Sequence, residues 1–380
     1  MEFSLSAENI MIRDKVRNWV NGECSRNQVL KWDDEGGIPL DKFQELADLG
    51  FCGLTVPGDF GGRGSGIFNT CLVLEELAAT SPPLAIQFAS CAVLGGALMD
   101  LLGTKEQQKE FFPSCVAGSL FVSLAAGDPD DPFWPRPDAP RYLQSGNHYI
   151  LTGIWNYVLL ADRARLFIVA AFHDKKDSRE WSFFLVKSGK GVLVEPIEAL
   201  GLRGASICRL KLDEIKITAD DALGGADKIG QGPKLWEKLS GLLSLYNAFI
   251  AVGLARGAFD YALEYAKQRI QFQQPIGRFP AIREKLTAIE IETNASRLLA
   301  LESAWLYDQG KPFARKAYMA QSLALRIARQ ACLDCLQIMG GYGYILEYDA
   351  QRMLRDSLGL IAMSEKRESL DARLGIGLGL

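Results

Sequence analysis

Residues 337–368 read QIMGGYGYILEYDAQRMLRDSLGLIAMSEKRE, and no other stretch says more about the fold. Three glycines, Gly340, Gly341 and Gly343, separate two segments in which apolar residues recur at helical spacing. Glycines in such a turn let two backbones approach closely. The stretch therefore predicts the end of a helix over residues 315–339, a tight turn, and a last helix over residues 350–374.

Helical spacing also governs the region just before this stretch. The apolar pattern predicts two more helices, over residues 233–271 and 281–308. Long helices with few loops between them pack as a bundle. We therefore predict that residues 231–380 form a C-terminal four-helix bundle.

The first 230 residues divide into two regions with different periods. Residues 1–118 show helical spacing with short breaks, and Asp41 and Thr104 are the predicted N-caps. Residues 119–230 hold short runs of Val, Ile, Phe and Leu between turn residues, a pattern typical of an antiparallel sheet or barrel. The predicted fold class is α+β multidomain, with an N-terminal helical domain, a middle antiparallel β-domain and the C-terminal bundle.

Composition excludes several classes of protein. A net charge of −4 over 380 residues lacks the basic excess of a nucleic-acid binder. No run approaches the roughly 18 apolar residues of a membrane span, and the N-terminus does not resemble a secretory leader. The eight scattered cysteines suggest no disulfide framework, and Cys332 and Cys335 lack the second pair that a zinc site would need. We expect buried, reduced thiols and a cytoplasmic location.

The glycine turn also carries a resemblance to a known family. The pattern Q-x-x-G-G-x-G-Y-x-x-E-Y, followed by the pair Arg355 and Asp356, resembles the C-terminal half of the acyl-CoA dehydrogenase family. RIQFQQPIG at residues 269–277 and PGDFGGR at residues 57–63 resemble it too. The resemblance extends over essentially the whole chain. It implies an FAD-dependent oxidoreductase that acts on the α,β C–C bond of an acyl thioester of CoA or of a carrier protein.

In that family each FAD lies between two subunits, and the resemblance sorts four residues by this geometry. Arg269, Phe272, Gln337 and Gly341 correspond to the surface that reaches the neighbour's cofactor. An arginine fork suits pyrophosphate oxygens, and glycine lets backbone N–H groups approach them. The resemblance thus implies a homo- or hetero-oligomer with an acyl-CoA dehydrogenase-like chain, and electron-transfer flavoprotein as a further partner.

The surface that would hold the chain's own flavin has changed more. The resemblance assigns Tyr157 to an aromatic that stacks on the flavin ring, and Trp155, two residues earlier on the predicted strand, would share its face. Leu159 replaces a hydroxyl residue, and GDPDDPFW at residues 127–134 lacks the family's Gly-Ser-Asp. The residues that would contact a neighbour's flavin are therefore kept, whereas several residues that would bind the chain's own flavin are lost.

The catalytic base of the family is a glutamate that removes the α-proton of the thioester. Family spacing places Ser364 at that position, and a serine hydroxyl is too weakly basic for the role. Leu243 occupies the alternative location of the base, and Ser244 that of an arginine near the substrate. Glu365 is the nearest carboxylate, but one helical step turns a side chain by about 100°, so it requires a local distortion of the helix.

Three hypotheses for the function remain open from the sequence. The first is a working flavoenzyme with Glu365, or a group outside the usual positions, as the base. The second is a catalytically degenerate partner subunit that completes the FAD site of an intact acyl-CoA dehydrogenase chain. The third is a related flavin enzyme with altered chemistry.

Overall fold

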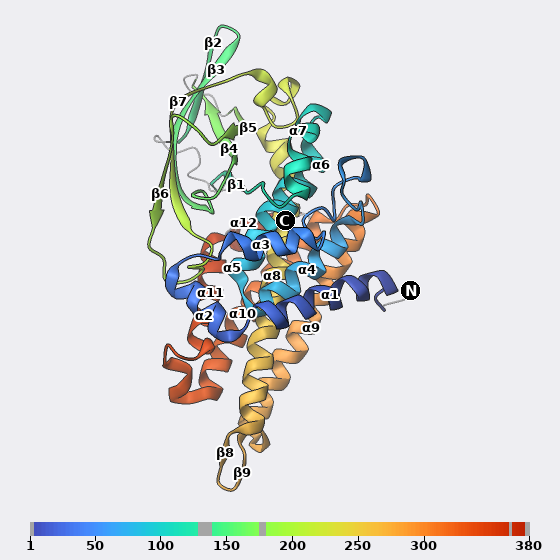
Figure 1. The fold of residues 1–380 in the computed structure, drawn as a ribbon, viewed down its shortest axis with the longest axis vertical. Coiled ribbons are helices and arrows are strands. Elements are labelled where there is room, and N and C mark those ends of the chain that lie inside the picture. The colour runs from blue at the N-terminus through green and yellow to red at the C-terminus, as the bar shows by residue number, and fades with distance from the viewer. Residues whose placement is uncertain (1–3, 128–138, 175–179, 365–366, 377–380) are drawn as a thin grey trace.

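A computed structural model describes residues 4–127, 139–174, 180–364 and 367–376. Helices lie toward both ends of the chain and a sheet lies between them, which confirms the predicted fold class (Figure 1). The domain boundaries near residues 118 and 230 stay a prediction. The early helices are α1 (Ala7–Glu23), α2 (Arg26–Glu35), α3 (Leu40–Asp48), α4 (Gly66–Thr80), α5 (Pro82–Ala89), α6 (Leu98–Leu102) and α7 (Lys105–Val116).

The two predicted N-caps have different outcomes. Thr104 caps α7, because its side chain accepts a hydrogen bond from the backbone N–H of Gln107 and the Gln107 side chain returns one. Asp41 is not a cap. Pro39 precedes α3, and Asp41 lies in the first turn, where a carboxylate interacts favourably with the helix dipole.

The middle sheet is mixed, so the prediction of a wholly antiparallel sheet is wrong in that detail. Strand β4 (Leu166–His173) pairs in parallel with β1 (Val122–Ala125) and with β2 (Arg141–Ser145). The other pairings, among β2, β3 (His148–Leu159), β4, β5 (Trp181–Lys187), β6 (Val192–Ile197) and β7 (Ile207–Ile217), are antiparallel. The β2–β3 hairpin separates β1 from β4 in sequence, and a strand pair joined by such a crossover can run in parallel.

The C-terminal helices are α8 (Gly232–Gln268), α9 (Pro280–Asp308), α10 (Ala314–Met339), α11 (Asp349–Met363) and α12 (Arg367–Ile376). The predicted single helix over residues 350–374 is wrong, because Ser364 ends α11 in an extended conformation, with φ −89° and ψ 165°. A small hairpin, β8 (Ile270–Gln271) and β9 (Gln274–Pro275), replaces the last turn predicted for α8. It lies at the lower tip in Figure 1.

The structure has two apolar cores. The smaller core consists of side chains from the strands of the middle sheet and the loops between them. The larger core consists mainly of side chains that pack the N-terminal helices against α8, α9 and α10. Two apolar helical stretches, Pro82–Leu102 and Gly232–Gln268, are long enough to cross a membrane by length and composition. Of the most apolar 18 residues of each stretch, 89% and 78%, respectively, are buried inside the protein. Helices in a protein core also meet this criterion of length and composition.

Candidate active site

A cavity of about 500 Å³ lies where the sheet meets the helices. Its walls come from α5, the π-helical segment η2 (Ser90–Ala97), β1, β3, α8, α10 and α11. This size falls in the range of small-molecule sites, which are commonly found between domains. The π-helical segment is fastened to the sheet, since the Ser90 hydroxyl donates to the carbonyl of Val122 at 2.8 Å and accepts from its N–H at 2.9 Å.

The part of this cavity wall that the structure describes is uncharged. Among the described residues that line it there is no Asp, Glu, His, Lys or Arg. Its titratable side chains are the phenols of Tyr157 and Tyr246, and burial raises the pKa of Tyr246 to about 12. A group with such a pKa stays protonated at neutral pH, so the described wall offers no general base.

Ser364 lines the cavity at the end of α11. Its hydroxyl donates to the carbonyl of Leu360 at 2.6 Å, one turn earlier on the same helix. Glu365, the predicted base, lies outside the described residues, so its role stays a prediction. The position that the resemblance assigns to the base is thus at the cavity, and Ser364 places there a hydroxyl that already donates a hydrogen bond.

Tyr157 lies on the opposite wall, which β3 provides, and 65% of its surface is exposed. It has φ 62°, and a register shift in β3 between Trp155 and Val158 accompanies this left-handed conformation. Trp155 also lines the cavity, as expected, but its side chain differs from that of Tyr157 in burial. Trp155 is 4% exposed, belongs to the core of the sheet, and donates through Nε1 to the carbonyl of Ala170 at 3.2 Å.

The two substituted positions on α8 also lie at this site. Leu243 lines the cavity, and Ser244 is fully buried next to it. The Ser244 hydroxyl has no hydrogen-bond partner among the described residues. Nothing in the sequence pattern singled out Gln321 of α10, which also lines the cavity and is fully buried. The sequence did contain one indication of Gln321, because it is a polar residue at a position where the helical spacing of α10 otherwise has apolar residues.

The four residues predicted to reach a neighbour's cofactor lie at the end of α8, in the following hairpin, near the end of α10 and in the glycine turn. The Arg269 guanidinium lies 5.7 Å from the ring centroid of Tyr342, which connects the end of α8 to the glycine turn. Phe272 is 88% exposed, and Gln337 and Gly341 are exposed as well. None of the four lines the cavity. Their assigned role stays a prediction.

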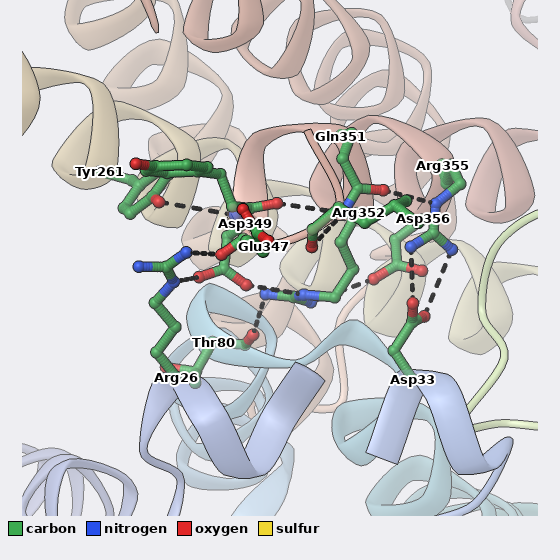
Figure 2. A network of polar contacts seen from close by, with 12 residues as sticks. Arg26, Asp33, Thr80, Tyr261, Glu347, Asp349, Gln351, Arg352, Arg355 and Asp356 are labelled. Atoms are coloured by element: carbon green, nitrogen blue, oxygen red, sulfur yellow. Dashed lines mark hydrogen bonds and ion pairs between the residues drawn. The ribbon is translucent and has the colours of Figure 1, made fainter. Parts of the chain in front are cut away.

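The Arg355–Asp356 pair, used above only as a spacing marker, anchors α11. Arg355 forms an ion pair with Asp33 of α2 at 2.5 Å and donates to the carbonyl of Leu200 at 3.0 Å. Figure 2 shows the Arg355–Asp33 pair together with the buried pairs that Arg352 makes with Asp349 and Asp356. The network fastens α11, and with it the cavity wall, to the N-terminal helices and to the loop after β6.

The cysteines give no sign of a metal or redox centre. Cys332 and Cys335 are free and buried, as are the other six, in agreement with the expectation of buried, reduced thiols. Burial raises the pKa of the Cys335 thiol to about 12. No group of three or more His, Cys, Asp or Glu side chains suited to a metal occurs in the part of the chain that the structure describes.

The cavity lies between a sheet and two helical regions, and its described wall is uncharged. Small-molecule sites of enzymes are commonly found in such places between domains. Comparison identifies the type of enzyme: residues 6–119 match the family described as "Acyl-CoA dehydrogenase, N-terminal domain", and residues 245–363 match "Acyl-CoA dehydrogenase, C-terminal domain". The chain belongs to the acyl-CoA dehydrogenase family, which confirms the resemblance in its sequence.

Particular relatives agree over nearly their full length. The chain is 30% identical to the probable acyl-CoA dehydrogenase YngJ of Bacillus subtilis, over 94% of each chain. It is 28% identical to subunit CarC of the caffeyl-CoA reductase-Etf complex of Acetobacterium woodii, over 92% of this chain and 93% of that one. Butyryl-CoA dehydrogenase from Megasphaera elsdenii has the same fold, with a TM-score of 0.93 at 24% identity and complete coverage of both chains.

Proposed function

We propose that this protein is an FAD-dependent oxidoreductase that acts on the α,β C–C bond of an acyl thioester carried by CoA or a carrier protein. The observation that carries the proposal is the cavity whose described wall has no charged side chain, with Tyr157 on the part formed by the sheet and Ser364 on the part formed by α11. An apolar acyl chain suits such a wall, because no charged group would have to be buried against it.

The residues present fit the ring end of a flavin. Tyr157 has a largely exposed aromatic face at the cavity, and aromatic faces stack on planar ring systems. When bound, a flavin supplies the hydride acceptor for the β-carbon. Tyr157 would orient the ring, while Leu159 and Leu243 exclude water from the thioester. Residues 127–134, apart from Gly127, lie outside the described part of the chain.

Removal of the α-proton needs a base, and as part of this proposal we assign that role to Glu365. It immediately follows Ser364, which lines the cavity where α11 ends. α11 ends at Ser364 in an extended conformation, so the helical rotation of about 100° per residue does not govern the step from Ser364 to Glu365. General-base catalysis typically contributes about a hundred- to ten-thousand-fold to the rate.

A second candidate is the degenerate partner subunit that completes the FAD site of an intact chain. Two observations favour it: the described cavity wall has no carboxylate, and the residues with a donating role lie exposed in and beside the hairpin after α8 and the glycine turn. Phe272, Tyr344 and Leu346 are 88%, 82% and 75% exposed there, respectively, an apolar surface of the kind that contacts another subunit. Both candidates therefore include a homo- or hetero-oligomer.

Two further elements of the proposal concern its cellular setting. One relative is a subunit of a caffeyl-CoA reductase-Etf complex, and we extend an electron-transferring flavoprotein partner to this chain on that basis. Eight free, buried thiols support a reducing compartment, so we assign the protein to the cytoplasm.

The experiment is anaerobic bleaching of the flavin absorbance by acyl-CoA thioesters, with the chain alone and co-expressed with an intact acyl-CoA dehydrogenase-like chain. Bleaching in the chain alone that falls at least a hundredfold in rate in Glu365→Gln supports the first candidate. Glu368→Gln, an exposed carboxylate on α12, is the matched control and should bleach like the unmodified chain. Unchanged bleaching in Glu365→Gln would eliminate that residue as the base, and bleaching only in the co-expressed pair would favour the partner subunit.

A further inference from the structure

Gln321 brings unpaired hydrogen-bonding groups to the cavity. It lies on α10, is 0% exposed, and lines the cavity. Neither its Nε2 nor its Oε1 has a hydrogen-bond partner among the described residues. Buried side-chain amides nearly always have partners, so an amide with both ends unpaired calls for a specific explanation.

Ser244 of α8 lies at the same level of the α8–α10 interface as Gln321. Contacts between Ser240 and Tyr318, and further along between Tyr265 and Tyr342, show that α8 and α10 run side by side in the same direction. One turn beyond the Ser240–Tyr318 contact, each helix carries a buried polar residue, Ser244 and Gln321, respectively. The Ser244 hydroxyl is also unpaired. Three unpaired polar atoms thus occur at one level of the α8–α10 interface.

The preceding turn shows what a satisfied version of this interface looks like. The hydroxyls of Ser240 and Tyr318 lie 2.9 Å apart, and the guanidinium of Arg373 donates to both. The same guanidinium lies 5.7 Å from the ring centroid of Trp236, a residue of the cavity wall. The charge of Arg373 is therefore engaged one turn away from the unpaired atoms.

The electrostatics of the cavity restrict what could pair with Gln321. The described wall has no charged side chain, so a carboxylate or an ammonium on the ligand would be buried without a counter-charge. A purely hydrocarbon acyl chain would leave the amide unpaired. A neutral group that can both donate and accept matches the amide, which offers one acceptor oxygen and an NH₂ donor.

We propose that Gln321, supported by Ser244, recognises a neutral hydrogen-bonding substituent, a hydroxyl or a carboxamide, on the acyl group of the substrate. This rests on the proposed function, because it assumes that the cavity takes an acyl thioester. Gln321 is then a specificity-determining residue, and the preferred thioesters carry a polar acyl chain. The site selects by hydrogen bonding, which discriminates more sharply than apolar contact does.

The test compares the affinities of hexanoyl-CoA and of a set of hydroxyhexanoyl-CoA isomers with the hydroxyl at successive carbons. Isothermal titration calorimetry on the purified holoprotein measures each affinity without depending on turnover. At least one hydroxy isomer should bind about tenfold more tightly than hexanoyl-CoA, the ratio that one additional hydrogen bond produces. Gln321→Leu should abolish that ratio by weakening the hydroxy isomer and strengthening hexanoyl-CoA.

The matched control is Ser296→Ala on α9. Ser296 is fully buried, has an unpaired hydroxyl and does not line the cavity, and it lies on α9 rather than one turn from the Ser240–Tyr318 contact, so the ratio of affinities should stay unchanged. Gln321→Met provides a second variant of nearly the same shape if Gln321→Leu does not fold. Equal affinities for all thioesters, or a preference that survives in the Gln321 variants, would overturn the inference and leave water as the partner of the amide. Binding of no thioester at all would instead overturn the proposed function as well.

Discussion

The carboxylate of Asp356 on α11 accepts a hydrogen bond from the backbone N–H of Leu202, at 2.7 Å, although the two residues are 154 positions apart. Both are fully buried, and Leu202 has φ 57°, a left-handed conformation that a leucine rarely adopts. The contact holds the loop after β6 against the helix that ends at Ser364. The orientation of the cavity wall therefore depends on a carboxylate outside the cavity.

We expect Asp356→Ala to lower the free energy of unfolding by about 3–5 kcal/mol. Arg352 is 3% exposed and lies 3.3 Å from Asp356, so the substitution leaves a buried guanidinium with one partner fewer. Urea denaturation measures the change. Glu35→Gln is the control, because the Lys31–Glu35 pair is exposed and such pairs contribute less than about 1 kcal/mol. A loss in Asp356→Ala no larger than in the control would contradict the anchoring role.

Gly257→Ala should destabilise the protein by about 1–3 kcal/mol or more, because a Cβ on α8 would overlap the carbonyl oxygen of Ala79 at the end of α4. Gly22→Ala on α1 is the matched control. A Cβ there meets no atom within 4 Å, and alanine stabilises a helix over glycine by about 0.5–1 kcal/mol. Thermal unfolding of both variants should thus move in opposite directions. Equal shifts would show that α4 and α8 can separate without cost.

Glu76 should make part of the stability dependent on pH. Burial alone raises the pKa of this carboxyl, but hydrogen bonds and charges from Arg17 and Arg256 outweigh it and lower the pKa below its ordinary value of 4.5. A folded-state pKa below that of the unfolded chain gives stability that is present above about pH 4.5 and is lost as the pH falls through the folded-state value. Glu76→Gln should flatten the decline of the urea midpoint on acidification, and should cost about 3–5 kcal/mol at neutral pH because Arg17 loses its ion pair with Glu76 and Arg256 keeps only Glu75. A decline as steep as in the unmodified protein would exclude Glu76 as its source.

Arg269→Ala tests the proposed role across a subunit interface. If the guanidinium holds a neighbour's FAD, its loss should weaken flavin binding about ten- to a hundredfold, the range for hydrogen bonds to charged groups. The measurement is bound flavin per chain by absorbance, with the mass of the assembly from light scattering. Arg278→Ala is the control, since Arg278 is exposed beside the same hairpin. A monomeric protein whose flavin content is the same with and without the Arg269→Ala substitution would refute both the oligomer and the role of Arg269 in holding a neighbour's FAD.

Much of the fold follows from local pattern. The helical periods predicted α8, α9 and α10 to within a few residues, and the short runs of Val, Ile, Phe and Leu in residues 119–230 predicted strands in the region that holds β1 to β7. These succeed because backbone geometry imposes a period of 3.6 or 2 on any element with one buried face. The order of motifs from residue 57 to residue 356 was also sufficient to indicate the family.

What the sequence by itself determined is therefore the order of elements and the family. The tertiary structure alone decided the parallel pairing of β4, the left-handed conformation of Tyr157, and the end of α11 at Ser364. It also decided which polar residues of α8 and α10 are buried without hydrogen-bond partners among the described residues, Ser244 and Gln321. The physical reason is that periodicity records which face of an element is buried, whereas a strand partner, a broken helix or an unpaired amide depends on residues distant in the chain.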